Sequence, residues 1–364
     1  KIERDADGRA TGILREWNAI ELVRRHIPDP NEATLSKWLA EAIAEAHSLG
    51  ITGIHDQRVE NEGAQSFRLW QKLEKDGRLQ LRVHMNIAAE LLPEATALGL
   101  QSGFGSDRLW VGHVKAFADG TMGSHTAWML ASFTDEPGNT GLAVTPPTSL
   151  WDLAVRAAAA GYALSVHAIG DRAVREVLDV YAELAARSPR PAAMPPRIEH
   201  VQLIHPDDLG RLAELGVVAS MQPVHLLTDW PTADKVWGDR ARYTYAFRTL
   251  LDKGTPLALG SDAPVAPLNP MLSFYAALNR MGVDGRPAHG WYPQEKITLP
   301  EIIAGFTTGP AMLSHKQAVQ GSITPGKWAD MVIMKQNLFE MEPSQIHQVR
   351  AAMTIFNGEV VWKG

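Results

Sequence analysis

The sequence predicts an α/β protein, and more narrowly a TIM-like (β/α)8 barrel that lacks its first strand and ends in the remnant of a small β-sandwich. Seven short apolar segments with strand character alternate with segments of helical periodicity from residue 51 onward. This alternation is typical of parallel strands joined by right-handed helical crossovers. An open doubly wound sheet could hold seven strands, whereas a closed barrel needs eight. The first recognisable element is a helix with no strand before it, which favours a barrel without its first strand.

The first elements follow from spacing and from stop signals. A helix is expected over residues 34–50, where Leu35, Leu39 and Ile43 lie on one face and Gly50 ends the helix. Strands are expected over 51–57, 79–88, 108–120 and 162–169, with helices over 64–77 and 149–161. These segments form the first half of the predicted barrel.

The second half continues the same alternation. Helices are expected from Asp171 onward and over 205–216, 241–254 and 298–314, and strands over 196–202, 217–224 and 256–263. The tail differs, because 320–334 and 350–364 read as short strands with a hairpin turn at Asn357–Gly358. We therefore predict a barrel domain over residues 1–320, incomplete at its N-terminal side, and C-terminal sandwich strands over 321–364.

Composition restricts the class of partner. The 364 residues are 45% hydrophobic and 21% charged, with a formal net charge of -6, as in an ordinary globular protein. Because no basic cluster is interleaved with aromatic residues, no nucleic-acid partner is expected. No apolar run approaches the roughly 18 residues of a membrane span, so we expect a cytoplasmic protein without membrane contact. The absence of cysteine means that any metal is held by imidazole, carboxylate or modified lysine.

Polar side chains follow several of the predicted strands at the point where each strand ends. In barrel numbering, Lys115 ends the fourth strand, His167 the fifth, His200 the sixth and Asp262 the eighth. Taken singly, each has a structural interpretation: a hydrogen-bonded histidine, an ion-paired lysine, or an aspartate in an Asx turn. Because the carboxyl ends of barrel strands share one rim, the four are expected to converge there.

Five stretches carry a resemblance to a known family. They read VKAFADGTMGSHTAW, SVHAIGDRAVREVLDVY, RIEHVQLIHPDDLGRLAELGVVASMQPVH, LALGSDAPVAPLNPM and GSITPGKWADMVIM. As a set they resemble the amidohydrolase superfamily, and more narrowly its YtcJ-like branch, which includes N-substituted formamide deformylases. The resemblance covers nearly the whole chain and implies a barrel metallohydrolase that cleaves an amide or related bond with metal-activated water.

The resemblance also implies roles for the residues at the strand ends. His167 and His200 match metal ligands, Lys115 matches a lysine that many members carry carboxylated, and Asp262 matches an aspartate that is both ligand and catalytic base. Zinc is the expected ion, because it suits imidazole and carboxylate donors, lowers the pKa of bound water to about 7 and polarises a carbonyl.

One departure from the family pattern is large. No His-x-His tripeptide occurs among the 13 histidines, and His55 belongs to the second strand. The predicted first strand and its two ligands are thus absent together, so we expect one ion in place of two and little hydrolysis by this chain alone. The C-terminal strands would then leave an unpaired edge, which predicts instability or a homodimer formed through that edge.

Three further residues are expected at the substrate. His225 follows the seventh strand, Asp119 follows Lys115, and Trp128 lies in the loop above the site; the alternatives are a capping histidine, an orienting aspartate and a tryptophan that packs for stability. Trp230, Trp237 and Trp291 are also expected in loops above the site.

The predicted function is hydrolysis of C–N bonds in a small-molecule amide-type substrate, such as an N-formyl compound. A catalytically dead barrel that binds or regulates is the first alternative. A metal-free lyase or isomerase that uses His167 and Asp262 as acid and base is the second.

Overall fold

The computed structural model describes residues 2–14, 17–57, 64–187 and 194–364. Contacts divide the chain into two compact units, Lys1–Ala42 and Ile43–Gly364. The first unit contains the antiparallel strands β1 (Ile2–Arg4) and β2 (Ala10–Leu14), helix α1 (Trp17–Arg24) and the start of α2 (Glu32–Ser48). The sequence did not predict this hairpin, because its strands are short and mostly exposed and show no clear alternation. The predicted boundary between residues 320 and 321 stays a prediction.

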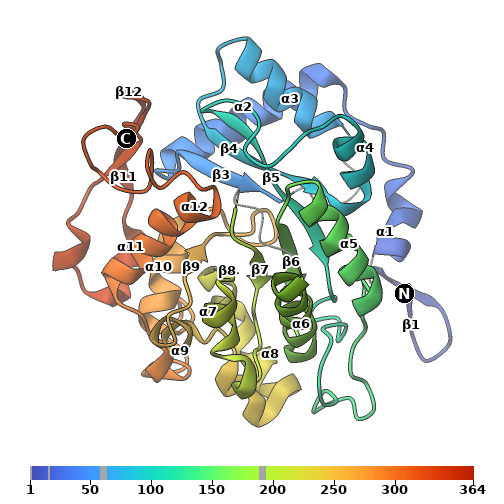
Figure 1. Ribbon diagram of the computed structural model, residues 1–364. Coiled ribbons are helices and arrows are strands. Elements are labelled where there is room, and N and C mark those ends of the chain that lie inside the picture. Colours follow the sequence, from blue (N-terminus) through green and yellow to red (C-terminus); the bar gives the residue numbers. More distant parts are fainter. Residues whose placement is uncertain (1, 15–16, 58–63, 188–193) are drawn as a thin grey trace. The chain divides into compact units, whose positions relative to one another are not determined.

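The second unit is built on one parallel sheet of seven strands, in the order in which they occur along the chain (Figure 1). The strands are β3 (Gly53–Asp56), β4 (Arg82–Ala88), β5 (Leu109–Phe117), β6 (Leu164–Ala168), β7 (Arg197–His200), β8 (Val218–Met221) and β9 (Leu257–Leu259). All seven predicted strands are confirmed, and so is their parallel pairing. Their carboxyl ends therefore lie along one edge of the sheet.

The sheet curls around its inward-facing side chains. Nη1 of Arg197 on β7 lies 2.9 Å from Nδ1 of His55 on β3, four strands away in the sheet order. In a flat sheet those strands would be separated by four spacings of about 4.8 Å each. Ser165 on β6 likewise donates to Oε1 of Gln57, just after β3, at 3.0 Å. The fold is therefore a curled parallel sheet whose order ends at β3 and β9.

Helices follow the strands along the chain and lie around the outside of the sheet (Figure 1). They are α3 (Gln65–Lys75), α4 (Leu92–Ala97), α5 (Pro147–Ala159), α6 (Asp171–Arg187), α7 (Arg211–Leu215), α8 (Leu226–Trp237), α9 (Phe247–Asp252), α10 (Pro270–Asn279), α11 (Leu299–Phe306) and α12 (Thr308–Leu313). None of the described helices is long and apolar enough to cross a membrane.

Several predicted helices differ in detail. The segment 298–314 forms two helices, because the backbone of Thr307 leaves helical geometry at φ -126° and ψ -72°. The segment 205–216 is a 3-10 turn (Pro206–Asp208) followed by the short α7. The helices α8 and α10 were not predicted; α8 carries Pro231 in its interior, a residue that normally indicates a break.

Side chains alternate between two environments along the strands. Apolar residues such as Val166 and Ile198 are fully buried within the large hydrophobic cluster that includes the helices. The inward positions are polar instead, whereas barrel interiors are usually filled by Val, Ile and Leu. They are occupied by the buried residues His84, Asn86, His113, Ser165, Arg197, Glu199 and Ser220. His84 and His113 thus lie in strand interiors.

The C-terminal residues form an antiparallel sheet. It pairs β10 (Met331–Met334), β11 (Ala351–Phe356) and β12 (Glu359–Lys363) in that order. The turn at Asn357–Gly358 has φ values of 53° and 85°, which confirms the predicted hairpin. Thr354 donates to the carbonyl of His47 at 2.6 Å and so ties β11 to the end of α2. A β-sandwich and a homodimer through this sheet stay predictions.

Candidate metal centre

Three side chains with atoms that can bind a metal lie close together at the carboxyl edge of the sheet. His200 ends β7, His225 follows β8 in a 3-10 turn (Pro223–His225), and Asp262 follows β9. One ligand atom from each lies within 4.8 Å of the other two. Nε2 of His225 is 3.7 Å from Oδ2 of Asp262, and the rings of His167 and His200 have centroids 4.6 Å apart. The structure therefore brings His167, His200 and Asp262 to one rim, with His225 among them.

The chemistry of this cluster fits a divalent cation. Nε2 of His225 is buried and has no hydrogen-bond partner in the described part of the chain. A buried polar atom without a partner is rare in folded proteins, so it indicates a missing ligand or a strained site. Two imidazoles and a carboxylate are donors that zinc and similar ions accept. The residues present thus suit a metal site. His225, which the sequence analysis predicted as a substrate contact, offers one of the ligand atoms of this site.

Hydrogen bonds determine which ring nitrogen carries the proton in His167 and in His200, and the two histidines differ in this respect. Nε2 of His167 donates to the carbonyl oxygen of Gly120 at 2.9 Å, so its Nδ1 carries the lone pair. Nδ1 of His200 lies 2.7 Å from Oε1 of Gln222, which leaves Nε2 of His200 for a cation. Burial, assisted by the charge of Lys115, lowers the pKa of His167 to about 3. Burial also holds the pKa of His200 well below its usual range, so both rings are neutral and available as ligands.

Lys115 lies in β5 next to this rim and is 5% exposed. Its Nζ is 4.4 Å from the centre of the Phe117 ring. Burial lowers the pKa of Lys115 to about 8, and the nearby charge of Arg197 acts in the same direction. A larger fraction of this amine is therefore uncharged at neutral pH than for an exposed lysine. Its role as a carboxylated metal ligand stays a prediction.

Asp119 holds two loops together beside His167. Its carboxylate accepts hydrogen bonds from the backbone N–H groups of Trp128 at 2.8 Å, Ile169 at 3.0 Å and Gly170 at 2.8 Å. The residue is 1% exposed, and its Oδ1 lies 3.4 Å from Nε2 of His167. Burial raises the pKa of Asp119 to about 7, against the opposing effect of the backbone hydrogen bonds. These contacts join Asp119 to the loops and to His167; its roles as a substrate contact and as a residue that orients Lys115 stay predictions.

The tryptophans expected above the site have different surroundings. Trp128 is half-buried, and the guanidinium of Arg172 lies 4.6 Å above its ring, so its role at the substrate stays a prediction. The expectation of a loop was wrong for Trp230 and Trp237, because both belong to α8. Trp237 is 1% exposed within the hydrophobic core, where it contributes to packing.

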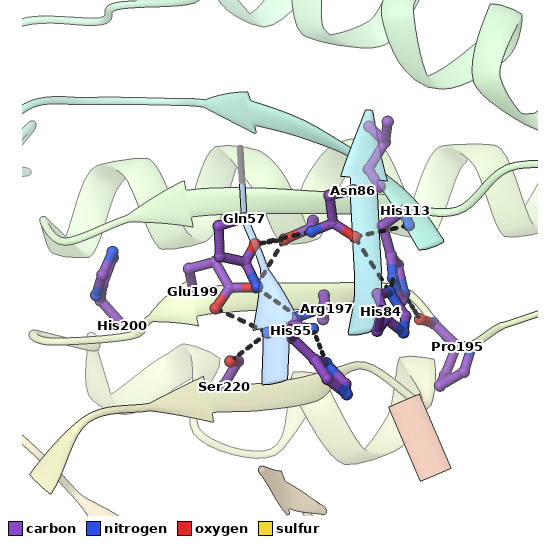
Figure 2. A network of polar contacts seen from close by, with 12 residues as sticks. His55, Gln57, His84, Asn86, His113, Pro195, Arg197, Glu199, His200 and Ser220 are labelled. Atoms are coloured by element: carbon purple, nitrogen blue, oxygen red, sulfur yellow. Dashed lines mark hydrogen bonds and ion pairs between the residues drawn. The ribbon is translucent and has the colours of Figure 1, made fainter. Parts of the chain in front are cut away.

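A network of buried polar groups lies inside the curled sheet (Figure 2). Nη2 of Arg197 donates to Oε2 of Glu199 at 3.1 Å and to Oγ of Ser220 at 2.7 Å. Glu199 also accepts from Ser165 at 2.7 Å, and the rings of His55 and His84 stack at 4.2 Å. The sequence reasoning missed this network. Its signal was the run RIEH, in which two oppositely charged residues fall on one face of a buried strand.

Gly170 allows the loop after β5 to approach the segment after β6. A Cβ at Gly170 would lie 2.0 Å from the carbonyl oxygen of Trp128. We expect Gly170→Ala to lower the free energy of unfolding by about 1–3 kcal/mol, because the overpacked loop must shift. Urea denaturation measures this change.

Gly260→Ala is the matched control. Gly260 also follows a strand, and a Cβ there would meet no atom of the described residues within 4 Å. Equal losses of stability in the two variants would show that the carbonyl oxygen of Trp128 does not prevent a side chain at position 170.

Comparison with known proteins shows that this chain is similar to hydrolases. A family model described as "Amidohydrolase family" matches residues 1–362. The Bacillus subtilis (strain 168) protein YtcJ is 28% identical over 100% of this chain and 68% of its own length. The N-substituted formamide deformylase of Arthrobacter pascens is 25% identical over 98% of this chain and 66% of its own length.

A solved structure agrees with these relatives. A metal-dependent hydrolase from Pyrococcus horikoshii OT3 superposes with a TM-score of 0.75 and is 26% identical, covering 94% of this chain and 68% of that protein. The chain therefore spans about two thirds of the length of each of these proteins.

Proposed function

Because this chain belongs to the amidohydrolase family, we propose that it provides the metal site of a hydrolase that cleaves C–N bonds in small amide-type molecules. The observation that carries this proposal is the cluster of His200, His225 and Asp262 at the strand ends, in which Nε2 of His225 has no hydrogen-bond partner among the described residues. The similarity to metal-dependent hydrolases supports a divalent ion, and the donor set favours zinc.

Each residue of the cluster has a role in the proposed reaction. When bound, a divalent cation lowers the pKa of water to about 7 and polarises the carbonyl of the scissile bond. His200 offers Nε2 and His225 offers a ring nitrogen as ligands, while His167 offers Nδ1 from the adjoining strand. Lys115, in carboxylated form, would add an oxygen ligand.

For Asp262 we propose a role in proton transfer. Its side chain is 30% exposed at the rim, so water and substrate can reach it. Burial raises the pKa of this carboxyl, while the charges of His225 and Lys115 oppose that shift. We assign to Oδ2 of Asp262 the acceptance of a proton from the attacking water and its transfer to the leaving nitrogen.

The ends of the sheet order suggest how the barrel is completed. Neither β3 nor β9 has a second strand partner among the described residues. We infer that an eighth parallel strand pairs with these edges and supplies the His-x-His pair that the family resemblance implies. Without that strand, the 364 residues are expected to bind one ion and to hydrolyse substrate slowly.

The substrate class follows from the family and from one relative. The name of the Arthrobacter pascens protein describes a deformylase of N-substituted formamides. For this chain we propose a small amide of that kind, contacted by Trp128 at the loop above the rim.

Metal content and bond preference together test the proposal. We expect the purified protein, dialysed against zinc and then freed of loose ion, to retain one zinc per chain by elemental analysis. In assays with N-substituted formamides, acetamides and matched esters, the amide-type substrates should be hydrolysed. Asp262→Asn should lower the rate per bound zinc by about 100-fold to 10,000-fold. A folded protein that retains no metal would contradict the proposal and favour a binding or regulatory role, or metal-free chemistry.

A further inference from the structure

Gln222 contacts the candidate ligand His200 from the neighbouring strand. It directly follows β8 and is 6% exposed. Its Oε1 lies 2.7 Å from Nδ1 of His200, and its Nε2 donates to the carbonyl oxygen of Ser220 at 3.2 Å. Because a carbonyl only accepts, the bond to Ser220 determines which end of the amide faces His200. Oε1 must therefore accept from an N–H at Nδ1 of His200.

The same residue also supports the second histidine of the cluster. The backbone N–H of His225 donates to the carbonyl oxygen of Gln222 at 3.2 Å, and the 3-10 turn that carries His225 begins directly after Gln222. Side chain and backbone of Gln222 therefore contact two of the three members of the cluster.

The backbone conformation at His200 explains why the hydrogen bond between His200 and Gln222 matters. His200 has a φ of 73° and the following Val201 a φ of 43°, both in the left-handed region, which few residues other than glycine adopt and which is a clear outlier for the β-branched Val201. Regular strand geometry therefore does not set the direction of the His200 ring. Strained conformations of this kind persist only when surrounding contacts hold them. The hydrogen bond that Nδ1 of His200 donates to Oε1 of Gln222 is such a contact.

We propose that Gln222 is a positioning residue that holds His200 in the tautomer with its proton on Nδ1 and directs Nε2 toward His225 and Asp262. The expected effect of Gln222 on metal affinity rests on the proposed function, whereas the tautomer of His200 is a property of the metal-free chain. Partners on the far nitrogen of a ligating histidine typically change metal affinity by about 10-fold to 100-fold. Gln222 should act with that magnitude.

The tautomer can be measured without metal. Long-range 1H–15N correlation spectra distinguish the two neutral forms of a histidine, and the His200→Ala spectrum identifies the signals of His200. We expect the Nδ1–H form in the parent protein and in Gln222→Glu, whose carboxylate can still accept the bond. Gln222→Leu should give the Nε2–H form or a mixture. An unchanged Nδ1–H form in Gln222→Leu would overturn the proposal.

Zinc affinity provides the second measurement. Competition with a chromophoric chelator should show a loss of about 10-fold to 100-fold for Gln222→Leu and recovery in Gln222→Glu. Gln202→Leu is the matched control, because Gln202 is another buried glutamine beside the rim but bonds to Asp229 at 2.8 Å. If Gln222→Leu does not fold, Gln222→Met replaces it.

The outcomes separate the two levels of inference. Equal zinc affinity in parent and Gln222→Leu would overturn the positioning role for metal binding. A parent protein that binds no zinc, but whose His200 tautomer depends on Gln222, would support the positioning role and contradict the proposed function.

Discussion

Arg197→Met is expected to lower the free energy of unfolding by about 3–5 kcal/mol, because it leaves a buried carboxylate without its counter-charge. Arg197 and Glu199 are each 3% exposed inside the curled sheet. Burial alone would raise the pKa of Glu199, but the charges of Arg197 and Lys115 outweigh burial and hold that pKa well below its usual range. The glutamate is thus an anion that depends on Arg197.

The pH dependence of the loss follows from the direction of that shift. A depressed pKa in the folded state contributes stability above the unfolded pKa of about 4.3, and that contribution is lost as the pH falls through the folded value. In Arg197→Met the contribution is absent. The difference in unfolding free energy between parent and variant should therefore be largest near neutral pH and shrink in acid. Urea denaturation at several pH values measures it.

A double variant provides the control for packing. Removing both charges in Arg197→Met/Glu199→Leu should be less destabilising than Arg197→Met alone, because no carboxylate is then left buried without Arg197. Additive losses from the two single variants would instead show that the pair contributes through packing and not through charge.

His200→Ala and His225→Ala are each expected to lower zinc affinity by more than the roughly 100-fold typical of a lost second-sphere partner. Each substitution removes one of the three donors that lie within 4.8 Å of one another. Elemental analysis after dialysis, followed by chelator competition, measures the change.

His125→Ala is the matched control for these variants. His125 lies in the loop after β5, with Nδ1 2.7 Å from Oε2 of Glu136 and Nε2 3.6 Å from Oδ1 of Asp135. It offers no atom to the cluster, so its removal should leave zinc content unchanged. Retention of zinc by His225→Ala would return His225 to the substrate role predicted from sequence.

The parts of the fold that could be predicted are those with a local cause. The seven parallel strands were all found, because short segments of strand character alternate with helical segments along the chain, and the hairpin at Asn357–Gly358 follows from residues that accept positive φ. The helix α8 was missed, because Pro231 is a local break signal that tertiary packing of Trp237 and its neighbours overrides.

The candidate site divides in the same way. The positions of His167, His200 and Asp262 at strand ends were visible, because parallel strands bring their carboxyl ends to one edge. The sequence also predicted His225 past the seventh strand, but as a substrate contact. Its distance of 3.7 Å from Asp262 depends on a short turn whose direction is set by the surrounding packing.

By itself, then, the sequence determined which segments become strands of the parallel sheet and which of them end in groups able to bind a metal, since both depend on residues close together in the chain. Only the tertiary structure decided that the sheet curls until Arg197 reaches His55, and that the side chain of Gln222 lies within hydrogen-bond distance of the His200 ring. Those contacts join residues far apart in sequence or on different strands, and their geometry depends on how the whole sheet bends and packs.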